Sequence, residues 1–215
     1  MKLAGNDIVD LKAPFAQGKS RHARYVDRIL TAEEKREMLS SACPDFMLWM
    51  FWSAKETALK VVRKIDRYVH AIPRKYVCRL GEGGKGKRVS GVVYTPLGDV
   101  RVAIQCTEEY LHCLGTLFPY LPEQELVYGV HQIHTSGDAL YDCSSDQVSQ
   151  DVRTIVIDRL ADYVSMNGGE MKITSAGSLS WRGYPEVMVN QERIPVDVSL
   201  SHDGRYVAYV FHPGN

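Results

Sequence analysis

The chain lacks a hydrophobic run long enough to cross a membrane, an excess of charge of either sign, and a closely spaced cysteine pair. Its 215 residues include 26 basic and 26 acidic side chains, so no net charge attracts nucleic acid or an anionic membrane. The first residues contain no apolar core of signal-peptide length. The 5 cysteines are an odd number without a Cys-x-x-Cys motif, which favours reduced thiols. We expect a cytoplasmic protein that binds neither nucleic acid nor membranes.

Two motifs that would suggest a nucleotide site or a zinc site are incomplete. Residues 81–88 have the spacing Gly-x-x-x-x-Gly-Lys, but Arg88 stands where a phosphate loop needs Ser or Thr, and a strand is expected to follow. We interpret this stretch as a hairpin loop. His131 and His134, with Cys143 downstream, lack the second cysteine pair that would complete a zinc site. We expect these histidines to lie on the surface.

One long helix is expected from Asp45 to about Arg63. Pro44 precedes it, Asp45 can cap it, and apolar residues recur at helical spacing. Glu56 and Lys60 are four residues apart, so they share one face of this helix. Taken alone, such a pair is most often an exposed ion pair that contributes little to stability.

The remaining pattern alternates between strands and helices. A capping box, Thr31 to Glu34, predicts a helix start. Residues 107–114 fit either a strand or a short helix. A second long helix is expected at 146–164, ended by Gly168-Gly169, and hairpins turn at 95–99 and at Asp203-Gly204. Strands are expected at 3–11, 76–80, 91–94, 100–104, 171–174, 185–189 and 196–201. In the last of these, alternation places Val198 and Leu200 on the buried side and Ser199 and Ser201 on the other.

Three separated stretches together resemble the signature of the 4′-phosphopantetheinyl transferase superfamily. They are Gly5-Asn6-Asp7, the helical stretch Trp52-Ser53-Ala54-Lys55-Glu56-Thr57-Ala58-Leu59-Lys60, and Ser201-His202 before a hairpin turn. The family carries a Gly-x-Asp strand, then an aromatic-small-x-Lys-Glu-small-x-x-Lys helix, and in many members a Ser-His pair. Each motif is weak alone, and the combination is specific.

The resemblance implies an enzyme of the holo-[acyl-carrier-protein] synthase type. Such enzymes use Mg²⁺ to transfer the 4′-phosphopantetheine group of coenzyme A to a serine of an apo carrier protein, in fatty-acid, polyketide or peptide biosynthesis, and release 3′,5′-ADP. It implies Asp7 and Glu56 as metal ligands, and Glu56 and Lys60 as catalytic residues. Lys60, Ser201 and His202 would contact coenzyme A. Lys75, with Arg74 and Arg182, is a further candidate phosphate contact on charge grounds alone.

The resemblance also implies an α+β fold of two similar α/β half-domains arranged as a pseudo-dimer, with coenzyme A in the cleft between them. We expect a first half-domain at 1–118, a linker at 119–145 and a second half-domain at 146–215. In the family a basic surface near the first helix receives the acidic helix of the carrier. Arg21, Arg24 and Arg28 are the candidates here, although a merely solvated basic face is the alternative. We expect a monomer.

The chain departs from the family pattern in three places. Val9 stands where many two-half members have a second acid, so we expect two protein carboxylates on the metal. Arg182-Gly183-Tyr184-Pro185 replaces Gly-Lys-Pro. The segment from Gln150 to Phe211 follows the Gly-x-Asp strand instead of preceding it, as in a circular permutation.

Two other functions stay open. One is a coenzyme A or nucleotide-binding protein without transferase activity, although retention of Asp7, Glu56 and Lys60 argues against it. The other is a Mg²⁺-dependent hydrolase of a diphosphate ester. A hydrolase of small molecules would not need the basic surface around Arg21. The identity of the carrier protein does not follow from the sequence.

Overall fold

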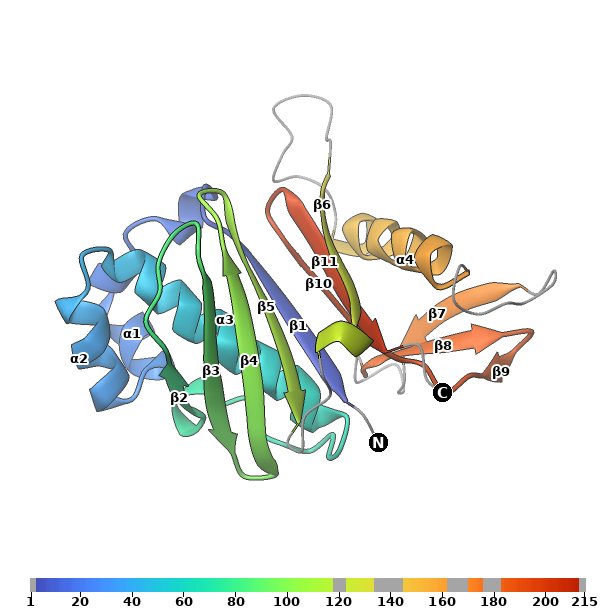
Figure 1. The fold of residues 1–215 in the computed structure, drawn as a ribbon, viewed down its shortest axis with the longest axis horizontal. Helices are drawn as coiled ribbons and strands as arrows, with labels where there is room; N and C mark the ends of the chain where they lie inside the picture. Colours follow the sequence, from blue (N-terminus) through green and yellow to red (C-terminus); the bar gives the residue numbers. More distant parts are fainter. Residues whose placement is uncertain (1–2, 118–122, 134–144, 162–169, 176–182, 213–215) are drawn as a thin grey trace.

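The computed structural model describes residues 3–117, 123–133, 145–161, 170–175 and 183–212. Within these ranges four α-helices and three antiparallel sheets form a mixed α+β fold, as expected. The five-stranded sheet and α1 to α3 lie on one side of the molecule, and two three-stranded sheets and α4 lie on the other (Figure 1). None of the helices in the described part of the chain combines the length and hydrophobicity needed to cross a membrane.

The largest sheet is ordered β1-β5-β4-β3-β2, with every neighbouring pair antiparallel. Its strands are β1 (Ala4–Asp10), β2 (Val77–Leu80), β3 (Arg88–Thr95), β4 (Gly98–Cys106) and β5 (Tyr110–Leu117). The ambiguous residues 107–114 therefore form a turn and a strand, and residues 81–87 connect β2 to β3 as a hairpin loop. A strand rather than a helix follows this glycine-rich loop, as predicted.

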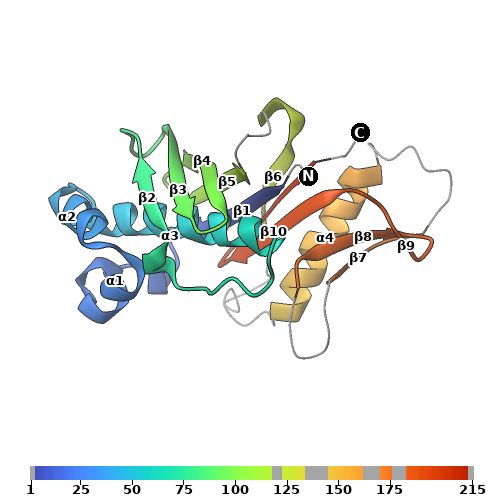
Figure 2. The same cartoon turned by 90° about the horizontal axis from the view of Figure 1, so that it is seen from below.

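The long helix α3 (Pro44–Arg63) covers one face of this sheet (Figure 2). Its buried side is apolar and packs on β1, β4 and β5, which explains the helical spacing of its hydrophobic residues. Gly5 allows the close approach to β1, because a Cβ atom there would lie 2.7 Å from Thr57 O and 2.8 Å from Val61 Cγ2. The glycine of the Gly-x-Asp motif is thus required by packing.

Shorter helices precede α3: α1 (Ala23–Ile29), α2 (Ala32–Ser40) and the 3-10 helices η1 (Pro14–Ala16) and η2 (Lys19–Arg21). The predicted capping box is confirmed, since Thr31 N donates to Glu34 Oε2 and Glu34 N donates to Thr31 Oγ1. The prediction that Asp45 caps α3 was wrong. The helix begins at Pro44, and the Asp45 carboxylate instead accepts hydrogen bonds from Gly18 N and Ser20 N, both at 2.7 Å, so it holds the preceding loop.

The second part of the chain forms two small sheets. One is ordered β7-β8-β9, from β7 (Met171–Ser175), β8 (Pro185–Val189) and β9 (Glu192–Arg193), and the other β10-β11-β6, from β6 (Val127–Gln132), β10 (Asp197–Asp203) and β11 (Tyr206–His212). The helix α4 (Ser145–Ala161) packs on β7, β10 and β11. Val156, Leu160, Val198 and Phe211 are central to this smaller core. Gly168-Gly169 lies outside the described residues.

The stretch expected as a linker contributes structure of its own. It contains the 3-10 helix η4 (Glu123–Glu125) and β6, which pairs with β11. His131 lies on β6 and stacks on Tyr209, with ring centroids 5.9 Å apart. His134 and Cys143 lie outside the described residues. The sheet of the second part therefore begins before α4.

The two parts meet along β1 and β10, which lie side by side. Backbone N–H groups on the free edge of β1 donate to side chains of β10: Ala4 N to Asp197 Oδ2, Asn6 N to Ser199 Oγ, and Asp10 N to Asp203 Oδ2, at 2.7, 3.2 and 2.8 Å. The side of β10 that carries Ser199 and Ser201 therefore faces β1. It is buried, like the opposite side that carries Val198, because its side chains accept hydrogen bonds from backbone N–H groups of β1 that would otherwise lack partners.

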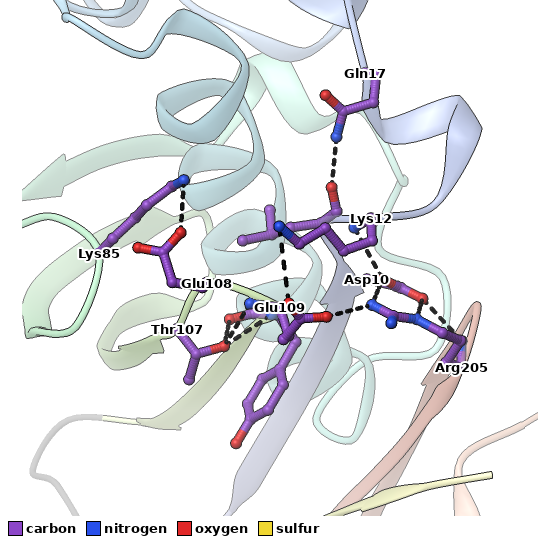
Figure 3. Close-up of polar contacts among 10 residues, drawn as sticks. Asp10, Lys12, Gln17, Lys85, Thr107, Glu108, Glu109 and Arg205 are labelled. Carbon is purple, nitrogen blue, oxygen red and sulfur yellow. Dashed lines mark hydrogen bonds and ion pairs between the residues drawn. The ribbon is translucent and has the colours of Figure 1, made fainter. Parts of the chain in front are cut away.

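A cluster of charged side chains, Arg205 with Asp10 and Glu109, stabilises one end of the junction between β1 and β10 (Figure 3). Arg205 donates to both carboxylate oxygens of Asp10, at 2.8 Å each, and to Glu109 Oε2 at 3.0 Å. The bidentate geometry suits a guanidinium and a carboxylate. These hydrogen bonds and the charge of Arg205 outweigh burial and lower the pKa of Asp10. The two parts are therefore joined by polar contacts as well as apolar ones.

Candidate active site

Asp7 and Lys60 meet between β1 and α3. Alternation along β1 turns Asp7 to the α3 side, where Lys60 Nζ lies 3.0 Å from Asp7 Oδ1 and donates to Asn6 O at 2.8 Å. Burial raises the pKa of Asp7, and the charge of Lys60 opposes that rise. The structure thus brings two of the predicted site residues together as a partly buried ion pair.

Glu56 occupies the same face of α3 as Lys60 and Arg63. Burial raises the pKa of Glu56, the charge of Asp7 raises it further, and the charges of Lys60 and Arg63 lower it. Asp7 and Glu56 therefore repel one another in a partly dehydrated space, where a positive charge is favourable.

These two carboxylates fit a hard divalent cation. Mg²⁺ prefers a few carboxylate oxygens and completes its shell with water and substrate phosphates. Within the described ranges no group of three or more His, Cys, Asp and Glu side chains is arranged to hold a metal ion. The protein would therefore supply only Asp7 and Glu56 as ligands to a cation here, and water and substrate phosphate oxygens would complete its coordination shell.

Two acidic or phenolic groups beside the site were not predicted. Burial raises the pKa of Asp203 to about 7, and the charges of Asp7 and Asp10 add to the rise, while a hydrogen bond from Asp10 N opposes it. Burial, followed by the charge of Glu56, raises the pKa of Tyr25 to about 12. Asp203 had been assigned only to the hairpin turn. Neither sequence position signals that Asp203 lies near Asp7 or that Tyr25 lies near Glu56.

Arg63 is a third residue that the sequence did not single out. Its Nε atom is buried and has no hydrogen-bond partner within the described part of the chain. It lies seven residues after Glu56, two turns along the same helix face. A buried guanidinium donor on the helix face of Glu56 is a candidate contact for a substrate phosphate.

His202 lines a cavity of about 580 Å³ on the other side of the junction. The lining residues are Ser149, Gln150, Val152, Arg153, Ser175, Gly183, Pro185, Leu200 and His202. Burial lowers the pKa of His202, and the charges of Lys60 and Arg153 lower it further, so the imidazole is neutral near pH 7. His202 lies on β10, which is the neighbour of the strand β1 that carries Asp7.

Ser201 points the opposite way from His202. Its Oγ accepts a hydrogen bond from Asn6 Nδ2 at 2.9 Å and is buried against β1. Lys75 ends the 3-10 helix η3 (Pro73–Lys75), which packs on α1 and α3, and it is not part of the lining of the His202 cavity. Arg74 Nη1 donates to Asp27 O, and Arg182 lies outside the described residues.

Lys55, the motif residue next to Glu56, faces the opposite direction. Its Nζ atom is 2.6 Å from Glu34 Oε2 and 2.7 Å from Ile29 O, and its side chain is 0% exposed. Glu34 Oε1 also accepts from Cys78 N. Lys55 therefore joins α3 to the end of α1, the start of α2 and β2, and it does not reach the Asp7 site.

The basic residues near the first helix are exposed. Arg21 lies on η2, and Arg24 and Arg28 lie on α1. The same helix carries Tyr25, whose ring centroid lies 6.2 Å from that of Trp52, one turn before Glu56 on α3, so Arg24 and Arg28 lie on a helix beside the carboxylate site. A partner bound there would approach Asp7 and Glu56.

Residues 4–91 match the family model of the 4′-phosphopantetheinyl transferase superfamily. This part of the chain is therefore a domain of that superfamily, and the resemblance is confirmed there. The matched span contains β1 and α3, and with them Asp7, Glu56 and Lys60; His202 lies beyond it. No curated protein matches the chain.

Proposed function

We propose that the protein is a Mg²⁺-dependent enzyme of the holo-[acyl-carrier-protein] synthase type. It transfers the 4′-phosphopantetheine group of coenzyme A to a serine of an apo carrier protein and releases 3′,5′-ADP. The observation that carries this proposal is the placement of Asp7, Glu56 and Lys60 beside one another, within the superfamily domain and next to the His202 cavity.

Asp7 and Glu56 would hold the Mg²⁺ ion, which when bound neutralises charge on the diphosphate of coenzyme A. Glu56 also serves as the candidate acceptor of the serine hydroxyl proton, because its raised pKa makes it a stronger base. Lys60 supplies a fixed positive charge for the leaving 3′,5′-ADP phosphate. Because β1 and α3 already hold these side chains in place, little entropy is lost in orienting them toward the reacting groups.

Coenzyme A occupies the junction of the two parts in this proposal. His202 donates a hydrogen bond from its neutral ring, and Arg153 supplies positive charge to the nucleotide phosphates. Ser201 contributes by fixing β10 against Asn6. Lys75 remains a candidate phosphate contact that would act from the η3 side.

We also propose that the chain consists of two related half-domains. The order β1-β5-β4 in the first sheet recurs as β6-β11-β10 in the second, and in both cases a long helix follows the first strand of the series. This supports two half-domains, the first at 1–118 and the second formed by 146–215 together with β6 from the segment at 119–145. One chain then contributes both walls of the cleft, which favours a monomer.

The carrier docks on the surface formed by Arg21, Arg24 and Arg28. This surface borders the carboxylate site, and an acidic carrier helix would complement its charge.

Release of 3′,5′-ADP tests the proposal against the two alternatives. Coenzyme A is incubated with the protein and Mg²⁺, with and without apo carrier proteins, and 3′,5′-ADP is quantified. A transferase releases it only when a carrier serine is present. Release at the same rate without any carrier would establish a hydrolase. Binding of coenzyme A without release on any carrier would establish a binding protein.

A further inference from the structure

Arg63, the last residue of α3, has no charged partner. Three lysines on or next to this helix each form an ion pair with a carboxylate: Lys55 with Glu34, Lys60 with Asp7, and Lys64 with Asp197. Arg63 forms no ion pair within the described ranges, and Asp66, the acid nearest to it in sequence, accepts a hydrogen bond from Tyr68 N at 2.9 Å instead. The chain therefore provides acceptors for these lysines but none for the arginine between them.

The Nε–H group of Arg63 is a buried donor without an acceptor. Among the described residues, only Arg63 Nε and Asn6 Oδ1 are buried side-chain nitrogen or oxygen atoms without a hydrogen-bond partner. Asn6 is neutral, whereas Arg63 carries a charge, and an unsatisfied buried donor is least favourable when it is charged. Because folded proteins satisfy nearly all such groups, this guanidinium indicates a place where an acceptor arrives from outside the chain.

Arg63 belongs to the helix face that carries the candidate active site. Glu56, Lys60 and Arg63 follow one another at spacings of four and three residues, which places their side chains on one side of α3. Arg63 lies about 4.5 Å further along the helix axis than Lys60, and long side chains of a helix point back toward its N-terminus. The guanidinium is thus directed toward Lys60 and Glu56, and its charge lowers the pKa of Glu56.

The segment 64–76 shields this position from water. It runs back from the end of α3 toward α1, and its 3-10 helix η3 packs on both helices (Figure 2). Tyr76, which is 2% exposed, closes the segment by donating from its hydroxyl to His70 O at 3.0 Å. The charges of Arg63 and Glu56 act on the pKa of Tyr76 in opposite directions. An anion bound by Arg63 here would be weakly screened by solvent and correspondingly strongly held.

We propose that Arg63 binds the diphosphate of coenzyme A beside Lys60. This inference rests on the proposed function and adds a substrate-binding residue to it. Two cations one turn apart on one helix face suit the two neighbouring phosphates of a diphosphate, and a guanidinium can donate two parallel hydrogen bonds to one phosphate. The 3′-phosphate of coenzyme A is left to His202 and Arg153, which line the cavity on the other wall.

Coenzyme A and dephospho-coenzyme A distinguish the two phosphate positions, because the second ligand lacks the 3′-phosphate and keeps the diphosphate. Binding of each is measured by isothermal titration calorimetry with Mg²⁺ and without a carrier, on the native chain and on two variants. Arg63→Met removes the guanidinium, and Arg67→Met removes the same charge from an exposed position on the segment that follows. Thermal melting without ligand is measured on all three proteins.

We expect Arg63→Met to bind both ligands at least roughly tenfold more weakly than the native chain, and Arg67→Met to bind both as the native chain does. Without ligand, Arg63→Met should unfold at the native temperature or a higher one, because it removes a buried charge that has no partner. A purely structural arginine would behave in the opposite way.

Three results would overturn this inference and leave the proposed transferase function standing, provided that the native chain binds coenzyme A and labels a carrier. The first is unchanged binding of both ligands to Arg63→Met. The second is weaker binding of coenzyme A alone, which would assign Arg63 to the 3′-phosphate. The third is a lower unfolding temperature of Arg63→Met without ligand. If the native chain binds neither ligand, the proposed function fails together with the inference.

Discussion

Lys55 and Lys35 form ion pairs of the same length in very different surroundings. Lys55 Nζ lies 2.6 Å from Glu34 Oε2 with both side chains buried, and Lys35 Nζ lies 2.6 Å from Asp27 Oδ1 at the surface. A buried pair contributes little by its formation, but removal of one partner leaves an uncompensated charge. An exposed pair is screened by water and contributes little in either sense.

The Lys55→Met variant should therefore lose roughly 3–5 kcal/mol of unfolding free energy, because the Glu34 carboxylate is left buried without its partner. Lys35→Met should lose less than about 1 kcal/mol. Urea denaturation of the two variants measures both values. Equal losses would mean that Lys55 does not fasten α1, α2 and β2 to α3.

The charged form of Asp7 lowers the stability of the folded protein, since burial raises the pKa of this carboxyl even beside Lys60. The Asp7→Asn variant should unfold at the same temperature as the native protein or a higher one, because it removes a dehydrated charge. Its transfer rate should fall by roughly 10²-fold or more, since one of two metal carboxylates is lost. Thermal melting and carrier labelling are measured on the same preparation. A variant that unfolds at a lower temperature and keeps its activity would contradict both the unfavourable burial of the Asp7 charge and its role as a metal ligand.

Asp203 makes stability depend on pH. Its pKa is raised by burial from 3.8 to about 7 in the folded protein, so the folded state retains a proton that the unfolded state releases. Between about pH 4 and pH 7 the unfolded state binds fewer protons, and stability falls as pH rises. Asp203→Asn should flatten this fall. Unfolding free energies at several pH values test it, with the exposed Asp158→Asn as the control that should leave the slope unchanged.

The packing of α3 on β1 sets the geometry of the site, because Asp7 lies on the strand and Glu56 and Lys60 lie on the helix. Gly5→Ala places a methyl group 2.7 Å from Thr57 O, closer than side-chain carbons approach backbone oxygens. Overpacking of this kind costs roughly 1–3 kcal/mol and shifts the helix. We expect lower stability and lower activity together. In Gly84→Ala, where no atom lies within 4 Å of the new methyl group, neither should change, as denaturation and activity assays can verify.

Local patterns predicted the elements whose signals are local. The capping box at Thr31, the apolar spacing of α3 and the turn at Asp203-Gly204 each specify a structure within a few residues. The assignment of Asp45 failed because its carboxylate is used by the loop at Gly18 and Ser20, a tertiary contact that no helix rule contains.

Only those residues of the candidate site that lie in local sequence motifs could be predicted. Asp7, Glu56 and Lys60 could be singled out because they lie in motifs of the superfamily domain. Asp203 and Tyr25 could not, since the proximity of Asp203 to Asp7 arises only when β10 packs on β1, and that of Tyr25 to Glu56 only when α1 lies beside α3. Sequence alternation separated Ser201 from Leu200, but it could not indicate that Ser201 faces Asn6 across the junction.

The junction between the two parts of the chain is central to the whole molecule. The carboxylates and Lys60 belong to the first part and His202 to the second, and the edge of β1 is held to β10 by side chains. Sites for ligands are common where two units meet. The proposed reaction uses this arrangement, because coenzyme A must be held by one wall while a carrier serine reaches it from the α1 side.

Intact-mass analysis of apo carrier proteins tests the proposed reaction most directly. Several carriers are incubated with the protein, coenzyme A and Mg²⁺, and in parallel with the Glu56→Ala variant and with a metal chelator. We expect at least one carrier to gain the mass of one phosphopantetheine group, and this gain to be lost in both controls. An unmodified mass for every carrier, from a folded protein that binds coenzyme A, would contradict the proposed transfer.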